Sequence, residues 1–421
     1  MKIATAFLVG LVCALPVQAA VHHSSDFGWT ANQDVTEELA KLLESGKLRS
    51  GDELVLDHTY RISGTHELPD NFTLSAVKGA GFDVTDAKDR CRFLVLGNNN
   101  TLHNLTITYL NTPKLGGRSI RHGKDFFDKR GINASGKSNL LIKNCRLVGM
   151  IAHHIAFGNC DQAEFIGCHI AGGYWSVVVS GKNLVFRRCL IEKSCGDGIK
   201  GGADGALVEN CVFQDNGRDG IDTTGGLNDT VIRNCTFRRL GVSGLDLKSH
   251  YEGADLSRPE NIGILIEKCL FHDMPNAVVL TTIDCGRRKG PGNELLNAAN
   301  MKKYAPHDID INDCVIGYAE TPLLPTGKGG YGVNYPTKEG EHMRVILLKD
   351  AYAIRYRNAR LFGDRIMPVY VRSDGGSRQL TKEAAEAIDH SVIGNVLDEP
   401  APPIKPGVKE VPFDCGPRAL E

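Results

Sequence analysis

The feature that most constrains this chain is an internal repeat centred on cysteine. Seven cysteines, the first five of them 21 to 24 residues apart, stand in short apolar segments of similar sequence: LLIKNCRL, EFIGCHI, LVFRRCLI, ALVENCVF, TVIRNCTF, ILIEKCLF and IDINDCVI. A second short apolar segment follows most of them, as in SVVVSG, DGIKGG and SGLDLKSH. A unit of this length, filled with short strands and turns, has no room for a helix and cannot bury an apolar face alone.

Stacked copies of such a unit bury their apolar faces against one another, and their strands pair in parallel from one copy to the next. The repeat therefore predicts an all-β solenoid, a parallel β-helix; the LxxLxL consensus of leucine-rich repeats is missing. The repeat cysteines are expected to point inward as a column of small buried side chains. They are Cys145, Cys168, Cys189, Cys211, Cys235, Cys269 and Cys314. The cysteines outside this column are the better disulfide candidates, namely Cys91, Cys160, Cys195, Cys285 and Cys415.

The two ends of the chain differ from the repeats. Residues 1–19, MKIATAFLVGLVCALPVQA, have one lysine, an apolar run and small residues before the expected cleavage point, which predicts a signal peptide. The protein is therefore expected to be secreted or periplasmic, and no later segment is apolar for long enough to span a membrane. We expect the β-helix domain over residues 20–375. Residues 376–421 are expected to form a C-terminal helix, LTKEAAEAIDH, and a Pro-rich extension.

Charge and insertions indicate the kind of partner. The 421 residues carry a formal net charge of −1, which argues against a dedicated nucleic-acid binder. Nothing in the sequence indicates an oligomer, so we expect a monomer. Insertions at 111–130, 251–260 and 284–306 interrupt the repeat, and such insertions map to loops around a binding face. The third carries Arg287 and Arg288, which predicts an acidic polysaccharide as the substrate, with these arginines binding its carboxylates.

Acidic and basic residues recur at equivalent positions of successive repeats. Because alternate residues of a strand face opposite ways, one set is expected to face inward: Ile199, Ile221 and Leu245. Lys200, Asp222 and Asp246 then face outward in one column, and Lys248 lies further along the same face. Neighbouring carboxylates repel, so this column needs a cation such as calcium, a shared proton or a basic partner. The competing interpretation is a ladder of salt bridges made with Lys200 and Lys248.

The N-terminal region carries a resemblance to a known superfamily. A predicted amphipathic helix at 35–48, VTEELAKLLESGKL, precedes the segment GDELVLDHTYRISG. This arrangement resembles the N-terminal cap and first coil of the pectin-lyase-like right-handed parallel β-helix superfamily, over roughly residues 30–375. The resemblance implies a right-handed β-helix with a short capping helix. It does not choose among the lyases, hydrolases, esterases, epimerases and tailspikes of that superfamily.

Within the superfamily, the acidic turns are similar to those of family 9 pectate lyases. That family has an Asp-Gly turn on one coil and an Asp-Asp-Gly-x-Asp segment on the next, and these acids bind calcium. Asp197 matches the first turn, and Asp219 and Asp222 match the last two acids of the second segment. Arg218 stands where the family has an acid, so one calcium ligand is missing.

The family's catalytic lysine has no direct counterpart. Its position on the next strand is occupied by Asp246, and Lys248 lies one outward position further on. We therefore expect Asp246 to supply the missing calcium ligand and Lys248 to be the base. These departures leave a related lyase family, such as an alginate lyase, equally open.

The reaction expected for such a site is β-elimination on a uronic-acid polysaccharide such as pectate or alginate. Lys248 would remove the C5 proton, His250 is a second candidate acid or base, and Tyr251 is a candidate acid for the leaving oxygen. Lys200 and Arg218 are expected to bind substrate together with the two arginines of the third insertion. The alternatives are a glycoside hydrolase that uses two carboxylates, a C5-epimerase, and a non-catalytic carbohydrate-binding β-helix module.

Overall fold

The computed structural model describes most of the repeats. The described residues are 19–86, 92–110, 130–150, 152–249, 261–272, 274, 277–283, 306–317, 343–348, 352–357, 360–362, 366–371 and 395–397. The predicted signal peptide, except its last residue, and the predicted C-terminal helix lie outside them, as do the insertions apart from Arg130 and Pro306. Among the described helices, none is long and apolar enough to cross a membrane.

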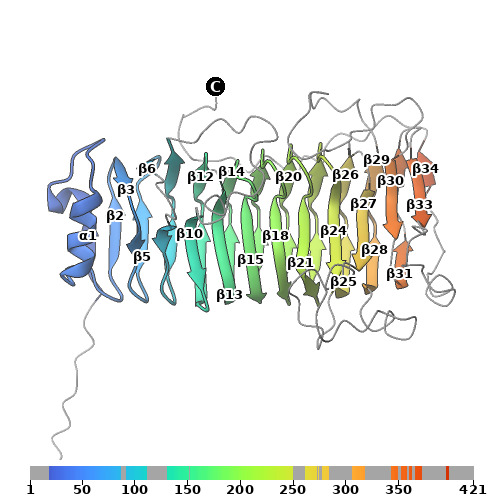
Figure 1. The fold of residues 1–421 in the computed structure, drawn as a ribbon, viewed down its shortest axis with the longest axis horizontal. Coiled ribbons are helices and arrows are strands. Elements are labelled where there is room, and N and C mark those ends of the chain that lie inside the picture. The colour runs from blue at the N-terminus through green and yellow to red at the C-terminus, as the bar shows by residue number, and fades with distance from the viewer. Residues whose placement is uncertain are drawn as a thin grey trace, which may run out of the picture.

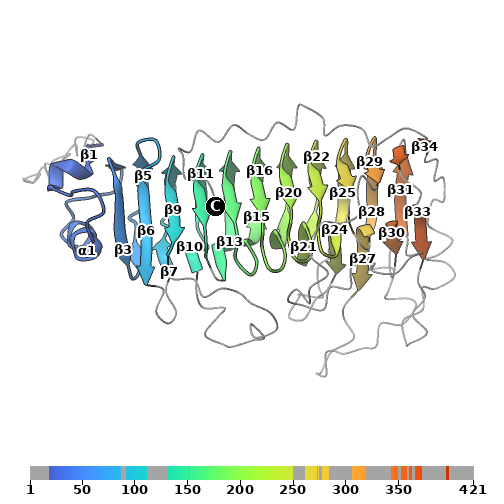
Figure 2. The ribbon, with the colours of Figure 1, turned by 90° about the horizontal axis from the view of Figure 1, so that it is seen from above.

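The described part of the chain is an elongated stack of coils made of parallel strands, so the all-β solenoid prediction is confirmed (Figures 1 and 2). Each central coil contributes two strands to one long sheet and a third, short strand to a second sheet. The second sheet consists of β3 (Thr59–Ser63), β6 (Gly81–Asp86), β9 (Thr106–Tyr109), β12 (Arg146–Val148), β14 (His169–Ala171), β17 (Leu190–Glu192), β20 (Val212–Gln214), β23 (Thr236–Arg238), β26 (Leu270–His272), β29 (Val315–Gly317), β32 (Arg360–Phe362) and β34 (Asn395–Leu397).

The long sheet runs the length of the stack and carries the acidic repeats. It consists of β1 (Val21–His23), β2 (Glu53–Leu56), β4 (His66–Glu67), β5 (Thr73–Ala76), β7 (Arg92–Val95), β8 (Thr101–His103), β10 (Arg130–Ser135), β11 (Ser138–Lys143), β13 (His153–Ile166), β15 (Val177–Lys182), β16 (Val185–Arg187), β18 (Ile199–Asp204), β19 (Leu207–Glu209), β21 (Ile221–Asn228), β22 (Val231–Arg233), β24 (Ser243–Ser249), β25 (Ile262–Glu267), β27 (Ala277–Ile283), β28 (His307–Asn312), β30 (Met343–Leu348), β31 (Tyr352–Arg357) and β33 (Ile366–Val371).

The N-terminal end of the stack is covered by a helix, as predicted. After the 3-10 helix η1 (Ser24–Phe27), α1 runs over Thr36–Glu44, four residues short of the predicted end at Leu48. Its buried face presents Leu39 and Leu42 to the first coil. This cap shields the open edge of the first coil from pairing with other chains. At the other end, β34 pairs with β32, which brings part of the C-terminal extension onto the stack.

The column of seven repeat cysteines is buried inside the stack as free thiols, which confirms the inward ladder. Each thiol donates a hydrogen bond to a backbone carbonyl of the preceding coil, for example Cys168 to Ile142 at 3.2 Å and Cys189 to Phe165 at 3.3 Å. The residue before each of them has a positive φ between 52° and 63°, which turns the chain from one sheet into the other. Asparagine and glycine are common there because they tolerate this conformation.

The disulfide prediction is wrong for two cysteines outside the column. Cys160 and Cys195 are free thiols in the structure. Cys160 ends up buried inside the sheet, and its thiol faces a backbone carbonyl, that of Gly158 at 3.7 Å. The other candidates, Cys91, Cys285 and Cys415, lie outside the described residues.

Candidate functional site

The acidic turns lie at the start of two strands of the long sheet, where successive coils approach closely. Asp197 precedes β18 and Asp219 precedes β21, and a glycine follows each of them. A Cβ atom on Gly198 would lie 2.8 Å from the carbonyl oxygen of Gly220, so only glycine fits between the stacked turns. The Asp-Gly pairs are therefore required by the packing of the coils, and this packing brings the two aspartates onto adjacent turns.

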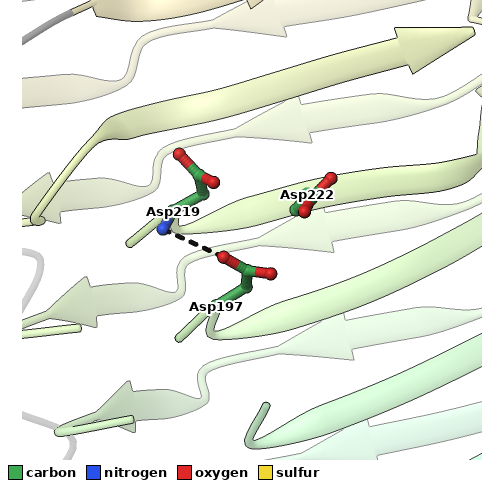
Figure 3. Close-up of side chains that lie close together, drawn as sticks. All are labelled: Asp197, Asp219 and Asp222. Atoms are coloured by element: carbon green, nitrogen blue, oxygen red, sulfur yellow. Dashed lines mark hydrogen bonds between the residues drawn. The ribbon is translucent and has the colours of Figure 1, made fainter. Parts of the chain in front are cut away.

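Each turn aspartate bonds to the coil that follows. The backbone N–H of Asp219 donates to Oδ1 of Asp197 at 3.3 Å (Figure 3). The backbone N–H and the hydroxyl of Ser243 both donate to Oδ1 of Asp219, at 3.0 and 2.5 Å. Both carboxylates are fully buried. One oxygen of each carboxylate thus links its coil to the following coil, which is a structural role.

The predicted outward column is present and in register. Lys200 pairs with Asp222, and Asp222 pairs with Asp246, on adjacent strands. Nζ of Lys200 lies 2.5 Å from Oδ2 of Asp222, and Nζ of Lys248 lies 2.9 Å from the same oxygen and 2.7 Å from Oδ2 of Asp246. The salt bridges of the competing interpretation are therefore present between Lys200, Lys248 and these aspartates. The aspartates face away from the core yet are buried, because the neighbouring lysine side chains lie against them.

The ladder leaves part of the acidic cluster unsatisfied. Oδ2 of Asp219, Oδ1 of Asp222 and Oδ1 of Asp246 are buried and have no hydrogen-bond partner among the residues that the structure describes. Asp197, Asp219 and Asp222 each offer one oxygen, and these three atoms all lie within 4.8 Å of one another (Figure 3). A buried acceptor without a partner costs stability. These oxygens can take up a proton or a cation.

Burial and mutual repulsion favour the protonated form of three of the acids. Burial raises the pKa values of Asp197 and Asp219, and repulsion between the neighbouring carboxylates raises them further. Burial, with repulsion from Asp222, also raises the pKa of Asp246 to about 6, although Lys248 opposes the shift. The cluster therefore contains carboxyl groups that hold a proton more tightly than ordinary aspartates do.

Asp222 and Lys248, which pair at the centre of the ladder, have pKa values shifted in favour of their charged forms. Burial would raise the pKa of Asp222, but the charges of Lys248 and Lys200 outweigh it and lower that pKa to about 2. Burial would lower the pKa of Lys248, but Asp246 and Asp222 outweigh it and raise the pKa above its ordinary value. Asp222 is thus ionised and Lys248 protonated when no other ligand is bound.

Solvent meets the basic side chains of the site first. The side chains of Lys200, Lys248 and Arg218 are 11%, 13% and 28% exposed, whereas the carboxylates beneath them are at most 3% exposed. Among the described residues, the nearest carboxylate oxygens to the Arg218 guanidinium are those of Asp197 and Asp219, at 3.9 Å. This separation exceeds hydrogen-bond distance, so the guanidinium N–H groups can bind an incoming anion.

Sequence reasoning missed the aromatic neighbour of this cluster. The indole ring of Trp175 stacks on His153, with ring centroids 5.4 Å apart and planes 5° from parallel, and Nζ of Lys200 lies 4.6 Å from its centroid. Val177 pairs in register with Ile199 of the next coil. Trp175 stands two residues before Val177, and Asp197 stands two residues before Ile199. Aligning WSVVVSG with DGIKGG would have placed the tryptophan at the aspartate position of the preceding coil.

The structure therefore brings together seven of the predicted site residues: Asp197, Lys200, Arg218, Asp219, Asp222, Asp246 and Lys248. The other four, His250, Tyr251, Arg287 and Arg288, lie outside the described residues. Their roles stay predictions.

Comparisons with known proteins agree with the fold. A family model of the right-handed β-helix region matches residues 93–281, and among curated proteins no sequence matches the chain. Similar solved structures include the surface protein and adhesin PfbA of Streptococcus pneumoniae, with a TM-score of 0.56, 11% identity and coverage of 83% of this chain and 99% of that one. The chain is thus a right-handed parallel β-helix, as predicted.

Two further structures show how widely this fold is used. The Dettilon tailspike protein has a TM-score of 0.52 and 12% identity, over 84% of this chain and 68% of that one. A polygalacturonase from Erwinia carotovora ssp. carotovora has a TM-score of 0.50 and 12% identity, over 85% of this chain and 96% of that one. At such identities the likeness shows the fold alone, so the activity has to be argued from the site.

Proposed function

We propose that this protein is a polysaccharide lyase that cleaves an acidic, uronic-acid-containing polysaccharide by β-elimination, as pectate and alginate lyases do. The observation that carries the proposal is the position of Lys248. Its amino group lies between two buried aspartates, next to a cluster of carboxylates with unpartnered oxygens, and reaches the solvent-facing side of the site. A polygalacturonase shares the fold, so a β-helix of this kind can act on such polymers.

The basic side chains of the site favour an anionic substrate. The side chain of Arg218 is partly exposed above the buried acids, so a uronate carboxylate would meet its positive charge first. The guanidinium of Arg218 can bind a carboxylate through two parallel N–H groups, which fixes the orientation of the sugar as well as its charge. Arg287 and Arg288 are proposed as further carboxylate ligands from the third insertion.

Calcium is the cofactor that the resemblance to family 9 pectate lyases implies, and the donor set fits it. The unpartnered oxygens of Asp219 and Asp222, with Asp197 beside them, suit an ion that prefers several oxygen ligands. When bound, a divalent cation would neutralise the uronate carboxylate and disfavour the charged form of Lys248. Asp246 is the fourth proposed ligand.

The chain's own residues would then perform the elimination. Neutral Lys248 takes the proton from C5, the C5–H electron pair forms the C4–C5 double bond, and the bond from C4 to the glycosidic oxygen breaks. That oxygen needs a proton, for which His250 and Tyr251 are the proposed donors. The products are a shortened polymer and a chain with an unsaturated sugar at its new end.

The test is an absorbance assay with several polymers. We expect the purified protein to raise near-ultraviolet absorbance on pectate, alginate or a glycosaminoglycan, because the unsaturated product absorbs there. The rise should require calcium and disappear with a chelator. A folded protein that gives no rise on any of these polymers, with or without calcium, would contradict the lyase assignment for them.

One observation favours a second candidate, a glycoside hydrolase. Asp246, with its pKa raised to about 6, stands next to the ionised Asp222 on the adjacent strand. A protonated acid beside an ionised carboxylate is the pair that glycosidases use. New reducing ends without an increase in near-ultraviolet absorbance would identify this activity instead.

Export is also proposed, and the first coil supports the predicted cleavage after Ala19. The backbone nitrogen of Ala20 lies 3.0 Å from Oδ1 of Asp52, whose side chain is almost fully buried. Cleavage at that bond would place the new terminal ammonium on this carboxylate and form a charge-assisted hydrogen bond. N-terminal sequencing of the exported protein should therefore begin at Ala20. A mature protein that keeps residues 1–19 would contradict the proposal.

A further inference from the structure

The ammonium group of Lys200 lies against two members of the acidic cluster. Its ammonium is 2.5 Å from Oδ2 of Asp222 and 3.4 Å from Oδ2 of Asp197. These aspartates are two of the three whose oxygens lie within 4.8 Å of one another (Figure 3). On its other side, the ammonium contacts the ring of Trp175. The lysine thus bridges Asp197 on its own coil and Asp222 on the following coil.

The ladder does not need Lys200 to neutralise Asp222. Lys248 contacts the same oxygen of Asp222, so two ammonium groups share Oδ2, while Oδ1 has no hydrogen-bond partner in the described part of the chain. One ammonium carries a single charge, whereas a divalent cation carries two and binds several oxygens at once. A divalent cation would therefore bind the carboxylates that Lys200 contacts and, in addition, oxygens that the two lysines leave without a partner.

We propose that Lys200 is an internal counter-ion of the cation site, which competes with a divalent cation for Asp197 and Asp222. Cation binding then requires the ammonium of Lys200 to move away from these carboxylates, and this exchange weakens the affinity of the site. The inference rests on the cation site of the proposed function, but it concerns ion binding and is tested without any cleavage.

Trp175 provides a reporter for this exchange. The chain has two tryptophans, and Trp29 is buried in the N-terminal cap, where it packs against Tyr60. A Trp29→Phe variant therefore leaves Trp175 as the single tryptophan. When Lys200 moves, the contact between its ammonium and the indole ring is lost, so the emission of Trp175 should change as the cation site fills.

The experiment is a titration with terbium, a luminescent substitute for calcium, in the Trp29→Phe background. Sensitised terbium luminescence and Trp175 emission are both followed, with calcium added at the end as a competitor. Removing the competing charge by Lys200→Met should tighten terbium binding at least about tenfold. Lys200→Arg keeps the charge and should bind as weakly as the parent protein.

A matched control removes a charge elsewhere on the stack. Lys182 is exposed at the end of β15, and Lys182→Met should leave terbium affinity unchanged. Circular dichroism checks the fold of each variant. If Lys200→Met needs calcium to fold, the calcium concentration that restores its spectrum reports the affinity instead.

Three results would overturn the inference: Lys200→Met binding no tighter than the parent, a similar gain in Lys182→Met, or no displaceable terbium in any variant. In each case, calcium-independent cleavage by the parent protein would still support the lyase assignment. Conversely, tighter binding by Lys200→Met in a protein that cleaves nothing would support the counter-ion and contradict the lyase.

Discussion

Replacing Lys248 by arginine is expected to lower kcat/KM on the cleaved polysaccharide by at least about 100-fold while leaving the protein folded, because general-base catalysis contributes about 10²- to 10⁴-fold. Arginine keeps the positive charge that pairs with Asp222 and Asp246. Its guanidinium does not lose a proton in proteins, so it cannot act as a base. The rate of near-ultraviolet absorbance increase measures the effect, and the midpoint of urea denaturation checks the fold.

The matched control is Lys182→Arg, the same substitution at an exposed position three coils earlier in the long sheet. It should retain the parent rate. If Lys248→Arg cleaved the polymer as fast as this control, Lys248 would be a member of the ladder only, and the base would have to be sought among His250 and Tyr251.

Replacing Asp222 by asparagine is expected to destabilise the protein by about 3–5 kcal/mol, the cost of breaking a buried ion pair from one side. Asp222 is fully buried and accepts both Lys200 and Lys248 on one oxygen. Asparagine keeps the shape but removes the charge, which leaves the two ammonium groups with one buried counter-charge fewer. Urea denaturation of the purified variant measures the loss.

Asp161→Asn provides the comparison for this second substitution. Asp161 is exposed and accepts a hydrogen bond from the side chain of Asn183 at 2.8 Å, on the same sheet. Its replacement should change the free energy of unfolding by no more than about 0.5 kcal/mol, as is usual at the surface. Equal effects of the two substitutions would show that the charge of Asp222 contributes little to holding the coils together.

The stack of coils could be predicted from the sequence because its signals are local. The spacing of the repeat cysteines predicted the coil length, and the alternation around Ile199, Ile221 and Leu245 predicted which side chains face inward. The structure pairs these three residues in register, so the column of Lys200, Asp222 and Asp246 follows directly. Strand periodicity carries this information within a few residues.

The disulfide prediction failed because a cysteine's partner depends on distances that spacing does not report. Cys160 lies within a strand of the long sheet and is buried there as a free thiol. The position of Trp175 could have been found by aligning WSVVVSG with DGIKGG, but its contact with Lys200 on the next coil is a distance that the alignment does not report.

By itself, the sequence determined the repeat, the parallel β-helix, the inward cysteines and the identity of the side chains on the outer face of the site. Only the tertiary structure decided how those side chains are paired: which oxygens the lysines occupy, which are left without a partner, and that basic groups cover buried acids. The physical reason is that periodicity assigns a residue to a face. Charge interactions depend on separations of a few ångströms between side chains on different coils, and these exist only once the coils are stacked.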